Sequence, residues 1–149
     1  IGDRLGEANV IKALGDVALQ QDRYEEAAER YEQALPVYRQ IGDRLGEANV
    51  IKALGDVALQ QDRYEEAAER YEQALPVYRQ IGAQLGEANT LVARARRAIA
   101  AGENSDAVSK MAEAIHIYTA IGLTKWAETF QAEAATWDAT GAKMPDSSQ

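Results

Sequence analysis

The chain has 149 residues, of which 46% are hydrophobic and 27% are charged, and its formal net charge is −8. This balance favours a globular protein, and the acidic excess argues against nucleic-acid binding, which needs a dense lysine and arginine surface. The absence of cysteine excludes disulfides and thiolate metal sites and fits a reducing compartment, so we expect a cytoplasmic protein. No apolar run approaches the roughly 20 residues that a membrane helix requires, so no membrane association is expected.

The sequence repeats itself every 40 residues. Residues 41–80 reproduce residues 1–40 letter for letter, residues 81–120 keep the frame with fewer identities, and Ile121-Gly122 opens a half unit. One such unit cannot bury its own apolar face, so the repeat predicts an all-α solenoid in which neighbouring helical hairpins share a core. The chain begins at Ile1 in mid-pattern without an initiator methionine, and we interpret it as a fragment of a longer protein.

The first unit is predicted to form two helices, over residues 4–21 and 23–40. Apolar residues at three- and four-residue spacing mark the first helix, and Asp3 is well placed to cap it. This first stripe consists of Leu5, Ala8, Ile11, Leu14 and Ala18. The stripe of the second helix consists of Tyr24, Ala27, Ala28, Tyr31, Ala34, Leu35, Tyr38 and Ile41.

The second helix carries three further signals. Asp22 with a glutamate three residues later resembles a capping box at its start, and Gly42 is expected to end it. Pro36 and its copy Pro76 lie inside, where proline normally costs about 3 kcal/mol. We keep the helix because its apolar stripe continues past the proline, and we expect a bend there. The alternative is a helix that stops near Leu35.

The later helices follow at the same spacing. They are expected over residues 44–61, 63–80, 84–101, 104–120 and 123–140. Arg94 occupies the place of Leu14, so either its helix turns slightly or the third unit packs loosely against its partner helix. We expect one solenoid domain over residues 1–140, with units 1–40, 41–80 and 81–120, a capping helix within 121–140 and a disordered tail at 141–149. The capping helix has the apolar anchors Trp126, Phe130, Ala134 and Trp137.

The unit resembles the tetratricopeptide repeat, which has Leu-Gly in its first helix and Tyr, Ala, an aromatic residue and Ala in its second. The matching residues are Leu14-Gly15, Tyr24, Ala27, Tyr31 and Ala34. Gly15 and Ala27 are small where two helices would cross closely. The usual repeat has about 34 residues, and this longer unit is similar to the repeats of polarity adaptors, kinesin light chains and bacterial signalling ATPases. The resemblance implies a right-handed superhelix that binds protein partners.

The resemblance also implies a binding surface, because the first helix of each tetratricopeptide unit lines a concave groove. By position, the groove residues are Asn9, Lys12, Asp16, Gln20, Asn49, Lys52, Asp56, Gln60, Asn89 and Arg96. Asparagine offers both a donor and an acceptor, so the asparagine row (Asn9, Asn49 and Asn89) suits the backbone of an extended peptide. The alternative is that these residues form solvated helix faces, with Lys12 and Asp16 as an intrahelical pair.

The third unit changes this chemistry, because Arg96 stands where the first unit has Asp16, with two more arginines within two residues. Such a cationic spot could hold a carboxylate of a ligand in a bidentate contact. Alternatively, these arginines pair with acids on the helix over residues 104–120, such as Asp106 or Glu113.

The N-terminal helix copies an internal helix, so an apolar edge with Leu5, Ala8 and Ile11 is expected to be exposed. The sequence shows no nucleophile–base set, no phosphate loop and no metal cluster, and His116 is its one histidine. We therefore expect no catalytic residues, cofactor or metal, but a scaffold that binds an extended or helical peptide of a protein partner. The alternatives are a module that self-associates end to end through the N-terminal edge, and the sensor arm of a larger signalling ATPase.

Overall fold

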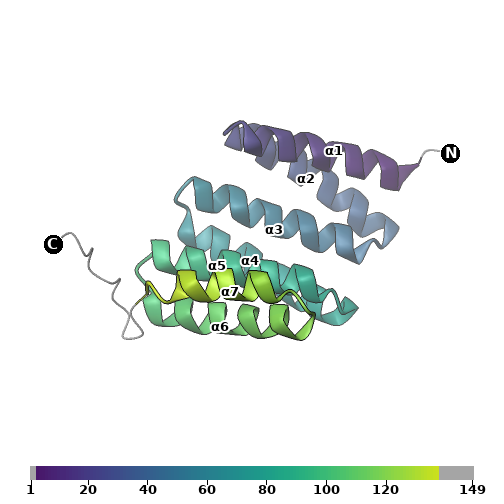
Figure 1. Ribbon diagram of the computed structural model, residues 1–149. Coiled ribbons are helices and arrows are strands. Elements are labelled where there is room, and N and C mark those ends of the chain that lie inside the picture. Colours follow the sequence, from purple (N-terminus) through teal and green to yellow (C-terminus); the bar gives the residue numbers. More distant parts are fainter. Residues whose placement is uncertain (1–2, 138–149) are drawn as a thin grey trace. The chain divides into compact units, whose positions relative to one another are not determined.

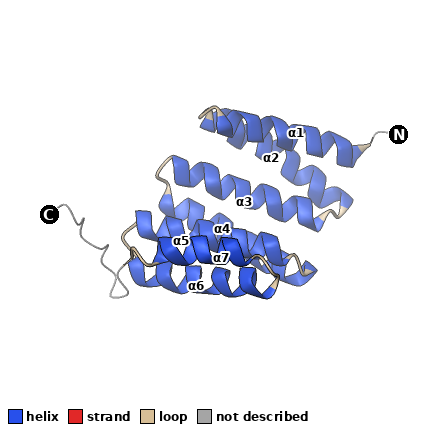
Figure 2. Cartoon of the chain, in the orientation of Figure 1, coloured by secondary structure: helices blue, strands red, loops and turns tan. Residues whose placement is uncertain are grey.

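The computed structural model describes residues 3–137, which form helices joined by turns (Figure 1). Its helices are α1 (Arg4–Gln20), α2 (Tyr24–Ile41), α3 (Arg44–Gln60), α4 (Tyr64–Ile81), α5 (Gln84–Ala100), α6 (Asn104–Ala120) and α7 (Thr124–Ala134). Figure 2 shows these helices joined by short turns. The predicted all-α class is confirmed, and each predicted helix end lies within one residue of the observed one, except that α7 ends earlier. None of the described helices combines the length and apolarity needed to cross a membrane.

Contacts between the helices divide the chain into two units, residues 1–83 and 84–149. In the first unit α1 packs against α2 and α3 packs against α4, and α2 in turn packs against α3. In the second unit α5 and α6 form a third hairpin, and α7 packs against α6 (Figure 1). The predicted series of helical hairpins followed by one more helix is therefore confirmed. The predicted tail at 141–149 lies outside the described residues.

The helix ends explain how such short turns reverse the chain. Asp3 caps α1 as predicted, and Asp43 caps α3 in the same way, because each carboxylate accepts the backbone N–H of the residue three positions on, at 2.8 and 2.9 Å. Gly42 ends α2 in the left-handed conformation with φ 74°, also as predicted. These two signals together fix the turn between the first and second repeats.

The predicted capping box at Asp22 is wrong. Asp22 lies in the left-handed region with φ 59°, and α2 begins at Tyr24 without a side-chain cap. The Asp22 carboxylate instead accepts a hydrogen bond of 3.1 Å from the hydroxyl of Tyr24. Aspartate tolerates this conformation because its short polar side chain can bond locally. The third copy has Gly102 at the same position, with φ 81°, so the turn itself requires a positive φ.

α2 and α4 run unbroken through Pro36 and Pro76. The predicted continuation of these helices is confirmed, and the predicted bend stays a prediction. Leu35 and Tyr38, on either side of Pro36, are both buried. Their burial in the core offsets the backbone hydrogen bond that the proline removes.

Tyrosines fill the space between the two helices of each hairpin. Tyr31 is fully buried, and a Cβ added to Gly15 would stand 2.7 Å from its ring. Tyr71 and Gly55 repeat this approach at 2.6 Å in the second hairpin. Glycine is therefore required here by the close crossing of two helices, and the predicted role of Gly15 is confirmed.

In the second unit, α7 covers the end of the third hairpin through aromatic contacts. Phe130 stacks on Tyr118 with ring centroids 5.3 Å apart, and Trp126 meets the same ring edge-on at 5.7 Å. Trp126 is still about half exposed, whereas Trp137, just beyond the helix, is buried. Two of the predicted anchors, Trp126 and Phe130, thus contact Tyr118.

Candidate peptide-binding surface

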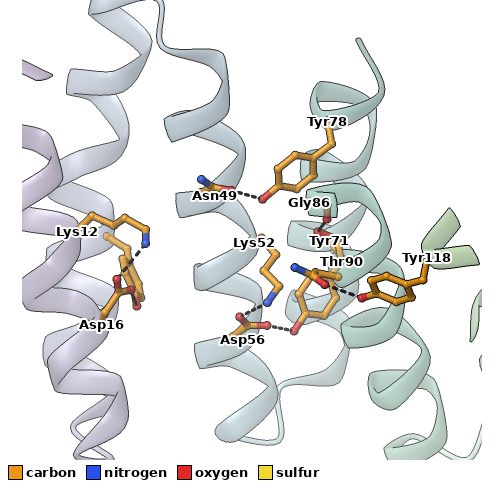
Figure 3. Close-up of polar contacts among 12 residues, drawn as sticks. Lys12, Asp16, Asn49, Lys52, Asp56, Tyr71, Tyr78, Gly86, Thr90 and Tyr118 are labelled. Atoms are coloured by element: carbon orange, nitrogen blue, oxygen red, sulfur yellow. Dashed lines mark hydrogen bonds and ion pairs between the residues drawn. The ribbon is translucent and has the colours of Figure 1, made fainter. Parts of the chain in front are cut away.

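Each of the first two hairpins has the same polar triad, which consists of a lysine and an aspartate on the first helix and a tyrosine on the second helix. Lys12 Nζ donates to Asp16 at 2.9 Å, and the hydroxyl of Tyr31 donates to the same carboxylate at 2.6 Å. The copy in the second hairpin, formed by Lys52, Asp56 and Tyr71, has distances of 2.9 and 2.7 Å (Figure 3). The triad joins a residue at the predicted groove to a tyrosine of the core.

The triad keeps its tyrosine neutral. Burial raises the pKa of Tyr31 and of Tyr71 far above the usual 10.0, and the hydrogen bond to the aspartate raises each pKa further. A carboxylate that accepts the hydroxyl proton opposes its loss, because deprotonation would place two negative charges side by side. The hydroxyl therefore acts as a permanent donor to the aspartate.

A second set of tyrosines donates hydrogen bonds to the asparagines of the asparagine row. The hydroxyl of Tyr38 donates to Asn9 Oδ1 at 2.6 Å, and Tyr78 donates to Asn49 at the same distance (Figure 3). In the second unit, Tyr118 donates to Asn89 at 2.5 Å. In every copy the partners lie 29 residues apart. This constant spacing was a signal in the sequence, although the pattern of apolar residues indicated only a packing role for these tyrosines.

A pocket of about 370 Å³ lies between α1 and α3 in the first unit. It brings together three predicted groove residues of α1 with one of α3. Its lining residues are Asn9, Lys12, Ala13, Asp16, Tyr38, Asp43, Leu45, Gly46 and Asn49. α1 and α3 therefore share a hollow that is lined in part by polar side chains. Gln20 and Gln60 lie farther along, exposed in the last turns of α1 and α3.

In the third copy the whole triad is replaced at once, by Val92, Arg96 and Met111. Arg96 donates two hydrogen bonds, of 2.9 and 2.8 Å, to the carboxylate of Glu133 on α7. Its guanidinium also lies 5.6 Å from the ring centroid of Phe130. The bidentate contact that the sequence predicted for a ligand carboxylate is thus made within the chain, by a residue of α7.

The neighbouring arginines also bind acids of their own unit. Arg94 Nη2 lies 3.7 Å from Asp106 Oδ2 on α6. This pairing was the predicted alternative to a ligand site. Arg97 is buried, and it binds Glu103 at 2.6 Å. Glu113, the other acid considered, pairs with Lys110 on its own helix at 3.3 Å. These arginines therefore hold α5 against the start of α6.

The predicted self-association edge needs a correction. Ala8 is fully buried and Ile11 is partly buried, because both face the core of the first hairpin. Leu5 is exposed, but so is its copy Leu45 in the second repeat, so its exposure is not particular to the N-terminal helix. The large apolar residues that are exposed in α1 but buried at the same positions in α3 are Val10, Leu14 and Val17, and none of them was predicted for this edge.

Two overlapping segments, residues 6–80 and 51–120, match the family model of the tetratricopeptide repeat. Among solved structures, the N-terminal domain of stress-induced protein-1 (STI-1) from C. elegans is similar, with 17% identity and a TM-score of 0.66 over 88% of this chain and 99% of that chain. A STAND protein with a tetratricopeptide repeat sensor, from Pyrococcus horikoshii, has 19% identity and a TM-score of 0.64 over 90% of this chain and 24% of that chain. BtubC (BKLC) from P. vanneervenii has 17% identity and a TM-score of 0.58 over 91% of this chain and 64% of that chain.

No curated protein matches the chain. The solved structures share too little sequence identity to indicate more than the fold. The family model, in contrast, covers residues 6–120 through its two segments, which is most of the chain. The chain belongs to the tetratricopeptide repeat family.

Proposed function

We propose that this chain binds a peptide of a partner protein across α1 and α3, at Asn9 and Asn49 of the asparagine row. Tetratricopeptide repeats in general are modules of protein–protein interaction and are typically non-catalytic. The observation that carries the proposal is the hydrogen bond between each row asparagine and a tyrosine of the core. It gives the asparagines a fixed orientation that a merely solvated helix face would not need.

The orientation has a chemical consequence. Because Oδ1 of Asn9 and Asn49 accepts a tyrosine hydroxyl, the Nδ2 group of each side chain is the remaining donor. Within the part of the chain that the structure describes, neither Nδ2 group takes part in a hydrogen bond, and both asparagines line the pocket between α1 and α3. Two donors held one repeat apart suit two carbonyl oxygens of a ligand, each bond contributing about 0.5–1.5 kcal/mol.

An extended peptide fits these donors better than a helical one. The carbonyl groups of a helix are already used within the helix, except in its last turn, whereas those of an extended segment are free to accept. The ion pairs Lys12–Asp16 and Lys52–Asp56 place both signs of charge beside the asparagines. Selectivity then depends on the order of charged side chains in the peptide rather than on its net charge.

A selection of short random peptides on the full chain supplies the probe for a test. Peptides recovered on the unmodified chain are titrated against the double variant Asn9→Ala and Asn49→Ala by isothermal calorimetry. We expect about tenfold weaker binding or more, since two hydrogen bonds are removed. Gln73→Ala, an exposed residue of α4, is the control and should leave the affinity unchanged.

An unchanged affinity in the double variant would refute the site. A third variant, Tyr38→Phe, separates orientation from contact, because it leaves Asn9 in place but removes the hydroxyl that fixes it. We expect an intermediate loss of affinity for this variant. We propose no catalytic activity and no cofactor. It stays a prediction that the chain is cytoplasmic and that it is part of a larger signalling ATPase.

A further inference from the structure

The outward face of α1 is apolar and uncovered, although the identical face of α3 is buried. α1 and α3 have the same sequence. The residues of this α1 face are Val10, Leu14 and Val17, which are 62%, 47% and 45% exposed. The same three positions of α3, 40 residues on, are 0%, 6% and 2% exposed. Since the two helices are chemically the same, the difference reports what packs against each of them.

In α3 this face is covered by α2, the second helix of the preceding repeat. The ring of Tyr38 lies so close to Gly46 that a Cβ there would overlap it. Arg39 Nε binds the carboxylate of Glu47 at 3.0 Å. The covered residues of α3 share one apolar cluster with Leu35 and Tyr38. The covering helix therefore contributes a leucine, a tyrosine three residues later and an arginine directly after it.

α1 presents the same contact points without such a helix. The nearest atoms to a Cβ on Gly6 belong to Asp3, the cap of the same helix. Glu7 is exposed, and its carboxylate makes no ion pair with any described residue, whereas its copy Glu47 is bound by Arg39 and also by Arg44 at 3.3 Å. The apolar face, the glycine and the glutamate that contact α2 on α3 are thus all present on α1, where no described helix contacts them.

We propose that the α1 face binds the second helix of another repeat of this type, a helix with the pattern of Leu35, Tyr38 and Arg39. The leucine and tyrosine of such a helix cover the apolar face and the glycine, and its arginine pairs with Glu7. The contact observed between α2 and α3 is the template, because it joins the same two sequences. This site uses other side chains than the asparagine row and does not depend on the function proposed above.

The third repeat supplies suitable variants. Its helix α5 has the polar residues Thr90, Arg94 and Arg97 at the three positions of the α1 face. A helix of this repeat therefore tolerates arginine at the last two of these positions. Leu14→Arg and Val17→Arg transfer the residues of α5 to α1, where both positions are exposed and the change does not disturb the core.

The probe is a synthetic peptide with the sequence of residues 22–42 and blocked ends, titrated into the full chain. Methyl groups of the α1 face are followed by NMR. We expect saturable shifts at Val10, Leu14 and Val17, and none at the covered copies in α3. An isolated helix of this length is only marginally formed in water, so the dissociation constant is expected in the range of about 0.1–1 mM.

The two arginine variants on the α1 face are expected to weaken peptide binding at least about tenfold, because they remove apolar contact area. The matched control is Leu85→Arg, which changes a leucine of α5 that is exposed to a similar degree. It should leave binding unchanged. Circular dichroism of each variant reports whether the chain remains folded.

A charge exchange tests the predicted register. Arg39→Glu in the peptide is expected to weaken binding about two- to fivefold, the scale of an exposed ion pair. Glu7→Arg in the chain should restore the affinity for the altered peptide and weaken binding of the original one. A contact driven by apolar area alone would show no such reciprocity.

Three results would overturn the proposal. The first is the absence of saturable shifts on the α1 face. The second is binding that persists undiminished in the Leu14→Arg variant. The third is a dimer in sedimentation experiments that Leu14→Arg abolishes but the peptide does not dissociate, because a second copy would then occupy the face through a different contact.

Discussion

The hydroxyl of Tyr31 donates a hydrogen bond of 2.6 Å to Asp16, which ties the middle of α2 to the middle of α1. In the third repeat both partners are absent together, replaced by Met111 and Arg96. Tyr31 without the aspartate would leave a buried hydroxyl with no acceptor, at a cost of about 1–3 kcal/mol, whereas Asp16 without the tyrosine would keep Lys12 as its partner. The pair therefore contributes to stability as one unit.

Tyr31→Phe is expected to lower the free energy of unfolding by about 1–2 kcal/mol, because it removes a hydrogen bond to a charged group while the ring stays in place. Urea denaturation followed by circular dichroism measures the change. Tyr24→Phe is the control, since its hydroxyl bonds Asp22 at 3.1 Å on the exposed side of the turn. The control should lose less than about 0.5 kcal/mol, and equal losses in both variants would contradict the argument.

The raised pKa values of the buried tyrosines predict that the free energy of unfolding falls as the pH rises above about 10. Burial raises the pKa of Tyr118 to about 12, and burial with the aspartate bonds raises those of Tyr31 and Tyr71 above the value of 10.0 in an unfolded chain. A folded state that holds a proton more tightly is stabilised below the unfolded pKa and loses that advantage as the pH rises through the folded pKa. Denaturation curves between pH 8 and about pH 11.5 measure the slope.

The control for this prediction is the ionisation of tyrosine read from the absorbance near 295 nm. In concentrated urea the tyrosines should titrate together near the unfolded value of 10.0. In the folded chain a fraction should titrate later. Tyr71→Phe should reduce both the late fraction and the alkaline loss of stability, and an unchanged slope would contradict the assignment.

Gly46→Ala is expected to destabilise the chain by about 1–3 kcal/mol more than Gly6→Ala, although both glycines follow the same sequence. A Cβ on Gly46 would overlap the ring of Tyr38, whereas a Cβ on Gly6 would meet the flexible carboxylate of Asp3 at 2.5 Å. Thermal unfolding of the two variants gives the difference. Because the helix caps of the two copies are alike, any effect on capping cancels, and equal melting temperatures would refute the contact.

Arg96→Ala is expected to loosen α7 without unfolding the hairpins. The substitution removes both hydrogen bonds to Glu133 and the contact with Phe130, which together are worth about 1 kcal/mol at this half-exposed position. Hydrogen exchange should accelerate in α7 and stay unchanged in α1. Lys125→Ala, an exposed residue of α7, is the control. Faster exchange throughout the chain would show that Arg96 has a wider role.

Much of the fold could be predicted from the sequence because its signals are local. The 40-residue period, the caps Asp3 and Asp43 and the glycine at position 42 determine where helices begin and end. The turn at Asp22 was wrongly predicted because an aspartate followed by a glutamate suits a capping box as well as a left-handed turn. Only the geometry of the hairpin decides between them.

The site was harder to predict because it depends on contacts between repeats. A helix inside a stack buries two faces, one toward its own hairpin and one toward the preceding repeat. The predicted apolar stripe mixes residues of both faces, because Ala8 is buried in the hairpin whereas Leu14 is exposed in α1 and its copy Leu54 is buried in α3. For this reason Ala8 was assigned to the edge, and Val10, which lies outside the stripe, was missed. Likewise, the donors of the asparagine row become visible only with Tyr38 in place beneath Asn9.

The identity of the first two repeats also bears on how the chain finds its fold. The residues of α2 and α4 are the same, so α1 could pair equally well with either, and no side chain tells them apart. Distance along the chain makes the choice. Pairing α1 with α2 closes a turn of residues 21–23, whereas pairing it with α4 closes a loop of residues 21–63. The entropic free-energy cost of closing the longer loop is higher by about 2 kcal/mol. Chain connectivity, rather than molecular recognition, therefore keeps each helix with its own partner during folding.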